Sequence, residues 1–280
     1  MNKRDVQLIL KQLKIRPKKS LGQNFLIDNN IAKKIIKESE LSDNDVILEI
    51  GPGLGVLTEL LVEKVNKIYA VDIEPKFCKY LSKRFANYNN IEIIKGDILK
   101  IQIPRSNKVV ANIPYSITGP ILEKVFFKSN PPQGIITIER NIANRIFSER
   151  NYKTFSRITV SFNSFMQPVS NYSILRNSFY PLPKIDLSLI KVMPKEHIHQ
   201  FLMNPENIDY YLKFIAGIMP YKNKNLANAL ELYLKRDKTE ILQILSNNNF
   251  ENIKLFSLRI EDFIELSKIF LNYEKLNKDK

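Results

Sequence analysis

The chain has 280 residues, of which 44% are hydrophobic and 26% are charged, and this composition excludes collagen-like and disordered proteins. It contains no run of roughly 18 apolar residues, the length needed to span a membrane, and its first residues lack the small-residue cleavage site of a secretory signal. A single cysteine, Cys78, excludes an intramolecular disulfide, and two histidines are too few for a zinc-finger ligand set. We therefore expect a cytoplasmic monomer that needs neither a membrane nor a metal.

The charge of the chain is strongly positive and unevenly distributed. Lysine and arginine exceed the acids by 14, which favours a polyanionic partner such as nucleic acid. Residues 1–40 contain ten Lys and Arg against four acids, and residues 140–190 contain seven against two. An even coat of lysine is the alternative, but the excess is local, and this favours a nucleic-acid partner.

Strand-like and helix-like patterns alternate through the first two-thirds of the chain. Asp28 before Ile31 and Ile35 predicts an N-cap and an amphipathic helix. Short apolar runs predict strands at 46–50, 67–71, 91–94, 108–111, 134–138 and 188–192. Helical spacing predicts helices at 54–64, from Pro75 to Phe85, and at 121–127. This alternation is typical of a parallel, doubly wound α/β sheet.

After Pro194 the strand-like runs stop. Helical patterns cover residues 210–218, 226–234, 240–245 and 261–271. We therefore place a domain boundary near Met193, with an α/β domain and its basic N-terminal arm at 1–193 and a small all-helical domain at 194–280.

A glycine-rich loop at 51–55 follows the first apolar strand and precedes a helix. Asp72 ends the next strand, 21 residues after Gly51, where a carboxylate can accept from both hydroxyls of a ribose. The third glycine of a dinucleotide fingerprint would fall at Val56, which disfavours NAD and FAD. The loop is similar to that of S-adenosylmethionine-dependent methyltransferases. Asp97 ends the third strand and is placed to accept from an adenine amino group, although a turn aspartate remains the alternative.

The segment Asn112-Ile113-Pro114-Tyr115 directly follows the fourth strand, at the sheet edge where such folds bind ligands. The exocyclic amine of a base is a poor nucleophile because its lone pair is delocalised into the ring. Acceptors at the Asn112 side chain and at a backbone carbonyl would oppose that delocalisation, and Tyr115 would stack on the base. Orientation alone can then supply up to ~7–11 kcal/mol. The alternative is an ordinary turn.

Four segments together carry a family resemblance over almost the whole chain: 19–26, 49–55, 112–120 and 179–186. On these residues the chain resembles the KsgA family of small-subunit ribosomal RNA adenine dimethyltransferases. The resemblance implies a Rossmann-like S-adenosylmethionine-dependent methyltransferase domain followed by the small helical domain.

The same resemblance implies roles for individual residues. Those assigned to the cofactor S-adenosylmethionine are Asn24, Leu26, Gly51, Asp72, Asp97 and Asn112. Asn112 would also orient the target amine, and Tyr115 and Phe179 would sandwich an adenine turned out of its stack, since enzymes acting on a base must unstack it.

Contacts to RNA phosphates are expected from lysine and arginine. The run containing Lys14, Arg16, Lys18 and Lys19 is the first candidate, with a solvated charged arm as the alternative. In the second domain the family tends to carry a denser basic cluster, whereas residues 221–225 supply only Lys222 and Lys224.

The expected function is therefore dimethylation of the N6 amines of two adjacent adenines in small-subunit (16S) ribosomal RNA, within a ribosomal subunit or its precursor. Two alternatives remain open. One is a large-subunit (23S) adenine N6-methyltransferase of the macrolide-resistance type, and the other is a non-catalytic nucleic-acid-binding protein on the same scaffold.

Overall fold

The computed structural model describes residues 1–18, 22–148 and 154–278, which form two compact units. The first unit comprises Met1–Phe126, Asn130–Ala143 and Gln167–Pro194, and the second comprises Phe127–Ser129, Asn144–Met166 and Lys195–Lys280. The expected limit at Met193 falls one residue before the first unit ends. The helical unit, however, also takes in the stretch 144–166, so it is not a purely C-terminal segment.

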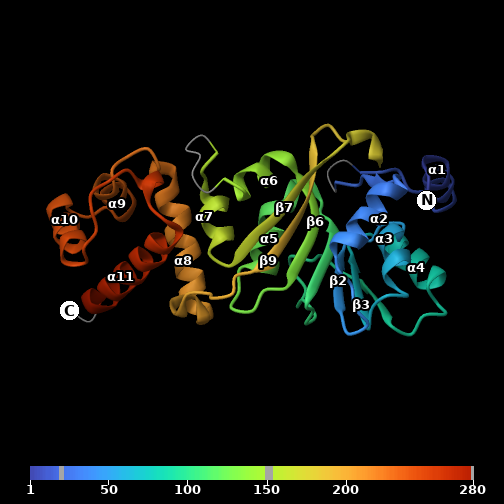
Figure 1. The fold of residues 1–280 in the computed structure, drawn as a ribbon, viewed down its shortest axis with the longest axis horizontal. Helices are drawn as coiled ribbons and strands as arrows, with labels where there is room; N and C mark the ends of the chain where they lie inside the picture. The colour runs from blue at the N-terminus through green and yellow to red at the C-terminus, as the bar shows by residue number, and fades with distance from the viewer. Residues whose placement is uncertain (19–21, 149–153, 279–280) are drawn as a thin grey trace. The chain divides into compact units, whose positions relative to one another are not determined.

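A seven-stranded sheet in the order β4-β3-β2-β5-β6-β9-β7 forms the centre of the first unit (Figure 1). Its strands are β2 (Val46–Ile50), β3 (Lys67–Asp72), β4 (Ile91–Lys95), β5 (Lys108–Asn112), β6 (Gln133–Glu139), β7 (Met166–Ile174) and β9 (Leu187–Pro194). Strands β2 to β6 pair in parallel, as the alternating pattern predicted. The predicted parallel pairing thus holds for β2 to β6, whereas β9 pairs with β6 in the antiparallel sense, so the sheet as a whole is mixed. Strand β9 begins where β6 ends, with the Arg140 amide donating to the Asp186 carbonyl at 2.8 Å, and so it runs back along its neighbour.

Among the described residues, six helices accompany this sheet, and two of them, α1 and α2, begin at side chains that accept from their free amides. The six are α1 (Lys3–Gln12), α2 (Asn29–Glu38), α3 (Val56–Leu61), α4 (Pro75–Arg84), α5 (Thr118–Phe126) and α6 (Arg140–Ile146), the last of which continues into the second unit after Ala143. The Asp28 carboxylate caps α2 by accepting from the amides of Asn30 and Ile31, and Pro75 occupies the first turn of α4, both as predicted. Helix α1 was not predicted, and it begins with a capping box between Asn2 and Asp5.

A two-stranded antiparallel ribbon lies apart from the main sheet. It pairs β1 (Phe25–Leu26) with β8 (Phe179–Tyr180), in the register Phe25 with Tyr180 and Leu26 with Phe179. A 3-10 turn at Arg176–Ser178 leads into β8. The ribbon joins two segments about 150 residues apart in sequence that both carry candidate site residues.

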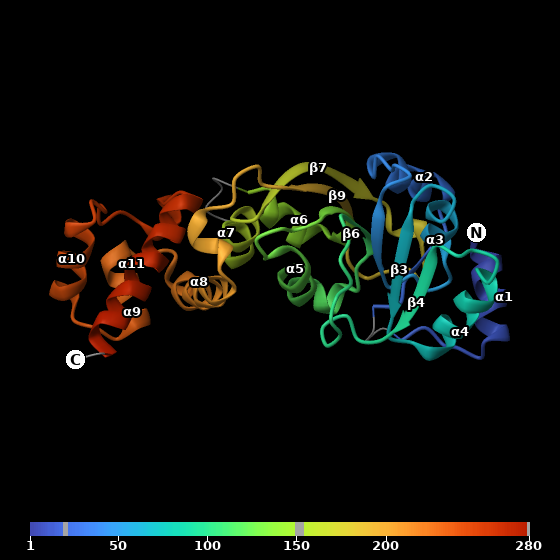
Figure 2. The same cartoon turned by 90° about the horizontal axis from the view of Figure 1, so that it is seen from below.

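The second unit is helical (Figure 2). Its helices are α7 (Arg157–Asn163), α8 (Pro205–Ile218), α9 (Leu226–Leu234), α10 (Lys238–Asn247) and α11 (Ile260–Lys278). Around α7, Phe155 packs on Phe263 with 6.1 Å between ring centroids, and the hydroxyls of Ser164 and Tyr211 are 2.6 Å apart. Within the described ranges, no helix has both the length and the apolar character needed to cross a membrane.

Candidate active site

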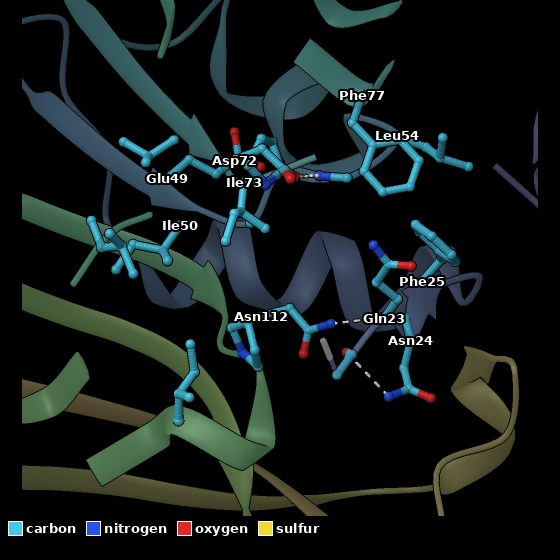
Figure 3. A pocket seen from close by; sticks show the side chains of 18 of the residues that line it. Gln23, Asn24, Phe25, Glu49, Ile50, Leu54, Asp72, Ile73, Phe77 and Asn112 are labelled. Carbon is cyan, nitrogen blue, oxygen red and sulfur yellow. Dashed lines mark hydrogen bonds between the residues drawn. The ribbon is translucent and has the colours of Figure 1, made fainter. Parts of the chain in front are cut away.

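A cavity of about 290 Å³ opens at the carboxyl edge of the sheet, where the strand order reverses between β2 and β5. Such a reversal is the point at which open α/β sheets bind their ligands. The walls come from the ends of β2, β3 and β5 and from the segment that contains β1 (Figure 3). The predicted residues that line it are Asn24, Leu26, Gly51, Asp72, Asp97 and Asn112.

The glycine loop forms the floor of this cavity and needs glycine for a steric reason. Gly53 has φ +56°, and a Cβ there would lie 3.3 Å from the ring of Phe25. Phe25 in turn meets the edge of Phe77, with ring centroids 5.6 Å apart. The loop, the ribbon and α4 therefore close around one end of the cavity.

Asp72 lies at the end of β3 and is almost fully buried. Its Oδ2 accepts from the Gly53 amide at 3.1 Å and its Oδ1 from the Glu74 amide at 2.8 Å. Burial raises the pKa of this carboxyl, and the two amide donors oppose that rise. Since each carboxylate oxygen has two lone pairs, each retains one that can accept from a ligand hydroxyl.

Asp97 combines a turn role with a place on the cavity wall. Its Oδ1 accepts from the amide of Leu99 at 3.0 Å, which is the turn geometry considered as the alternative from sequence. The residue is half-buried and lines the cavity beside Ile98. The turn thus holds the carboxyl at the cavity and is compatible with a binding role.

Asn112 is held in one orientation by the chain itself. Its Nδ2 donates to the backbone carbonyl of Asn24 at 3.0 Å (Figure 3). The Tyr115 hydroxyl donates to its Oδ1 at 3.5 Å. The Asn24 side chain is engaged elsewhere and donates to the Gly22 carbonyl at 3.2 Å. The Asn112 nitrogen therefore faces the β1 segment, and its oxygen, which accepts from Tyr115, keeps a second lone pair for a ligand.

Neither Tyr115 nor Phe179 is among the residues that line the cavity. Tyr115 is half-buried, and burial raises the pKa of its phenol. Phe179 is 3% exposed and packs in the same apolar cluster as Leu26, opposite which it lies in the ribbon. Tyr115 thus lies beside Asn112, whereas the Phe179 ring is covered within the apolar cluster.

Sequence reasoning did not assign a role to Glu49, which also lines the cavity. It is 2% exposed, and the Thr58 hydroxyl donates to its Oε2 at 2.7 Å. Burial raises the pKa of this carboxyl to about 7. An acidic residue inside an otherwise apolar strand, two positions before the glycine loop, was the signal that could have identified it.

The predicted RNA-contacting cations fall into two groups. Lys14, Arg16 and Lys18 are exposed, with half-buried residues alternating between them, so their side chains can share one face of the arm; Lys19 lies outside the described residues. In the second unit, the Lys222 ammonium donates to the Phe155 carbonyl at 2.7 Å, which gives it a structural contact that sequence reasoning did not foresee, and Lys224 is exposed.

Metal ligands do not gather anywhere in the part of the chain that the structure covers. No group of three or more His, Cys, Asp or Glu side chains is arranged there to hold a metal ion. Cys78 is buried, and burial raises the pKa of its thiol to about 11, as befits a packing residue.

The fold resembles solved methyltransferase structures. A dimethyladenosine transferase from Plasmodium falciparum matches with a TM-score of 0.74 at 26% identity, covering 90% of this chain and 98% of that one. The 23S rRNA methyltransferase ErmE matches with a TM-score of 0.61 at 21% identity, covering 88% and 98%. The sheet, the glycine loop and the cavity at the switch point therefore define a Rossmann-like methyltransferase.

Sequence comparison identifies the family within the Rossmann-like methyltransferases to which the chain belongs. The family model described as ribosomal RNA adenine dimethylase matches residues 14–270, and the chain belongs to this family. Among its relatives, the ribosomal RNA small subunit methyltransferase A of Borreliella afzelii is 31% identical over 96% of this chain and 94% of its own length. A probable enzyme of the same name from Thermococcus sibiricus is 32% identical over 96% and 97%. The family predicted from the sequence is thus confirmed, and it is a family of enzymes.

Proposed function

We propose that this protein transfers methyl groups from S-adenosylmethionine to the N6 amines of two adjacent adenines in small-subunit ribosomal RNA. Each amine takes two methyl groups, so the complete reaction requires four transfers. The observation that carries this proposal is the Asn112 amide, which the Asn24 carbonyl holds with its oxygen presented at the switch-point cavity.

The residues around the cavity fit S-adenosylmethionine. When bound, this cofactor supplies an electrophilic methyl group on a sulfonium sulfur. Asp72 keeps one lone pair on each carboxylate oxygen for the two ribose hydroxyls, and Asp97 offers an acceptor to the adenine amino group. The apolar wall of Phe25, Leu26 and Phe77 excludes water from the remainder of the group.

The target amine is activated by position and by hydrogen bonding. The Asn112 oxygen accepts one of its hydrogens, and a backbone carbonyl at Ile113 or Pro114 accepts the other, which draws the nitrogen lone pair out of the ring. Proton loss can follow to solvent, so no ionised base is required. Tyr115 and Phe179 hold the unstacked adenine, and Phe179 must be uncovered from its apolar cluster for this to occur.

The choice of small-subunit RNA is supported by the relatives. Those at 31% and 32% identity over nearly their whole length are named as small-subunit enzymes. The likeness to ErmE, at 21% identity, extends to the fold only. An intact Asn112 and Asp72 at the cavity favour an enzyme over a binding protein on the same scaffold.

The basic arm after α1 also contacts the phosphates of the RNA. Lys14, Arg16 and Lys18 are exposed, and Lys19 would extend the same run. Lys224 is a secondary candidate, since Lys222 already donates to a backbone carbonyl. Each cation that meets a phosphate adds to the salt dependence of binding.

Transfer of labelled methyl groups to three acceptors tests the proposal. Small ribosomal subunits from cells lacking this modification, large subunits and naked RNA are each incubated with the protein and radiolabelled cofactor. We expect label in the small subunit, retained in dimethyladenosine after nuclease digestion. Label in large-subunit RNA alone would assign the protein to the resistance type, and no label in any acceptor, with the protein folded, would leave a binding protein.

A further inference from the structure

Two arginines share one carboxylate at the carboxyl edge of β6, outside the cofactor cavity. Arg140 Nη1 lies 3.5 Å from Asp186 Oδ2, and Arg176 Nε lies 3.5 Å from Asp186 Oδ1. The backbone joins the same residues, because the Arg140 amide donates to the Asp186 carbonyl at 2.8 Å. The group carries a net charge of +1, in a stretch of sequence with seven cations and two acids.

The guanidinium groups are only partly satisfied by this carboxylate. Charge-assisted hydrogen bonds are commonly about 2.7–2.9 Å long, whereas both contacts here measure 3.5 Å. The Arg140 Nε is buried and has no hydrogen-bond partner in the described part of the chain. A guanidinium presents five donors in a planar fork that matches carboxylate and phosphate, so this pair retains donor capacity for a second anion.

Each arginine is close to one of the two segments that the proposed function uses to hold the adenine. Thr137 of β6 is the register partner of Asn112, and Arg140 follows three residues later. With strands about 4.8 Å apart and about 3.3 Å per residue, the two backbones are separated by roughly 11 Å. Arg176 begins the turn that leads into Phe179. That turn is fixed by the Ser178 hydroxyl, which donates to Asp28 at 3.0 Å.

Solvent and ligands can reach this group. The side chains of Arg140, Arg176 and Asp186 are 35%, 49% and 56% exposed, so an anion can approach their exposed nitrogens, whereas the buried Arg140 Nε is reached only if the guanidinium turns. A surface ion pair of this kind contributes only about 0–1 kcal/mol to stability, and stability alone is therefore a weak reason for its presence.

We propose that Arg140 and Arg176 bind an RNA phosphate next to the target adenine, and that Asp186 holds the two guanidiniums in place until that phosphate displaces it. The base enters beside Asn112 while the backbone of the same strand stays at the sheet edge, clamped between β6 and the turn before β8. This inference rests on the proposed function, since it concerns the RNA substrate of the same site.

The test uses an oligoribonucleotide that contains two adjacent adenines in their small-subunit sequence, with the full-length protein. Its binding to Arg140→Gln and Arg176→Gln should weaken by about tenfold each, and the slope of log affinity against log salt should fall by about 0.7 for each lost contact with single-stranded RNA. Cofactor affinity should not change. Arg259→Gln is the matched control, because it also removes an exposed arginine paired with an aspartate, at 3.0 Å.

The Asp186→Asn variant distinguishes a phosphate-binding role of these arginines from a purely structural role. Loss of the competing carboxylate should strengthen RNA binding by about threefold if a phosphate takes its place, whereas a structural role predicts weaker binding. A methylphosphonate beside the target adenine should weaken binding to the wild type and cause no further loss in Arg140→Gln.

Unchanged salt slopes in both arginine variants, or weaker binding by Asp186→Asn, would overturn the phosphate site. Methyl transfer to small ribosomal subunits that lack the modification is measured in parallel. If the wild type binds with the predicted slopes but transfers no methyl group, the proposed function fails and the phosphate site stands.

Discussion

At the scale of single residues, the proposed reaction depends on the orientation of the Asn112 side-chain amide. Because Asn112 donates to the Asn24 carbonyl, its oxygen is the atom left to accept from an amine. A carboxamide placed the other way round would present hydrogens to the amine and would repel it. The role proposed for Asn112 therefore depends on a backbone atom that lies 88 residues earlier in the chain.

We expect Asn112→Ala to lower the rate of methyl transfer by at least about 10²-fold, the usual cost of removing a hydrogen bond made in the transition state. Cofactor affinity should stay within about tenfold, because the amide acts mainly on the reacting amine. Single-turnover kinetics measure the rate of methyl transfer, and calorimetric titration measures the affinity for the cofactor. Abolished cofactor binding would show that Asn112 is chiefly a binding residue.

Glu49 gives the site a pH dependence whose sign follows from its burial. Its folded-state pKa is about 7 against an ordinary value of 4.5, so the folded chain binds this proton more tightly than the unfolded chain does. The resulting stability is fully present below about pH 4.5 and is lost as the pH rises through about 7. Its full size is on the order of 3 kcal/mol.

Glu49→Gln should remove this component, so the difference in unfolding free energy between variant and wild type should grow as the pH rises from about 5 to about 8. Urea unfolding at several pH values measures it. A bound sulfonium should favour the ionised carboxylate, so cofactor affinity of the wild type should rise over the same range and that of the variant should not. Parallel pH profiles for the two proteins would contradict this account.

At the scale of elements, helix α1 supports the wall of the cavity. Val6 and Leu10 are buried in one cluster with Phe25, Leu54 and Phe77, and the last three line the cavity. The helix has no atom in the cavity itself, so any effect it has on the cofactor must pass through these side chains.

Leu10→Ala should destabilise the protein by about 2–5 kcal/mol and weaken cofactor binding, because the wall loses its support. Leu245→Ala is the matched control, since Leu245 is 2% exposed and lies in α10 of the other unit. Calorimetric titration of both variants with the cofactor measures whether only Leu10→Ala weakens cofactor binding. An equal effect of the two substitutions on cofactor affinity would rule out a specific role for α1.

The arm that follows α1 is a second element with a separable role. Replacing Lys14, Lys18 and Lys19 with alanine should reduce the salt dependence of RNA binding by about 0.7–0.9 in slope for each phosphate contact that is lost. Fluorescence anisotropy over a range of salt concentrations measures it. An unchanged slope would mean that the arm is only a solvated charged segment.

At the scale of the whole molecule, each unit is built from more than one stretch of chain. The helix α7 and the residues around it belong to the helical unit, and Phe155, Phe165 and Ser164 contact Phe263 and Tyr211 there. Their apolar surface is buried only when the C-terminal helices are present.

A chain that ends at Met193 should therefore expose this surface and aggregate or bind a hydrophobic dye, as large exposed apolar patches do. Full-length Tyr211→Phe is the control, because it removes one hydroxyl and should cost only about 1 kcal/mol. Size-exclusion chromatography measures the aggregation of the truncated chain and of the Tyr211→Phe control, and dye binding measures their exposed apolar surface. A monomeric fragment with cooperative unfolding would show that the first 193 residues fold independently.

Most elements were predictable because their signals are local. The strand at Val46–Ile50, the Asp28 cap and the Pro75 start each depend on residues adjacent in sequence, and the structure has all three. Helix α1 had a readable signal in the helical spacing of Val6 and Leu10. The two-residue strands of the ribbon had none, since periodicity needs a longer run.

The sequence by itself determined the family, the α/β alternation and the positions of the glycine loop, Asp72 and Asn112, because each is a contiguous pattern at the end of a strand. Only the tertiary structure decided that β9 runs antiparallel, that Asn24 orients Asn112 and that Glu49 is buried at the cavity. These features arise from contacts between residues far apart in the chain, and burial and hydrogen-bond direction are set by neighbours that only folding brings together.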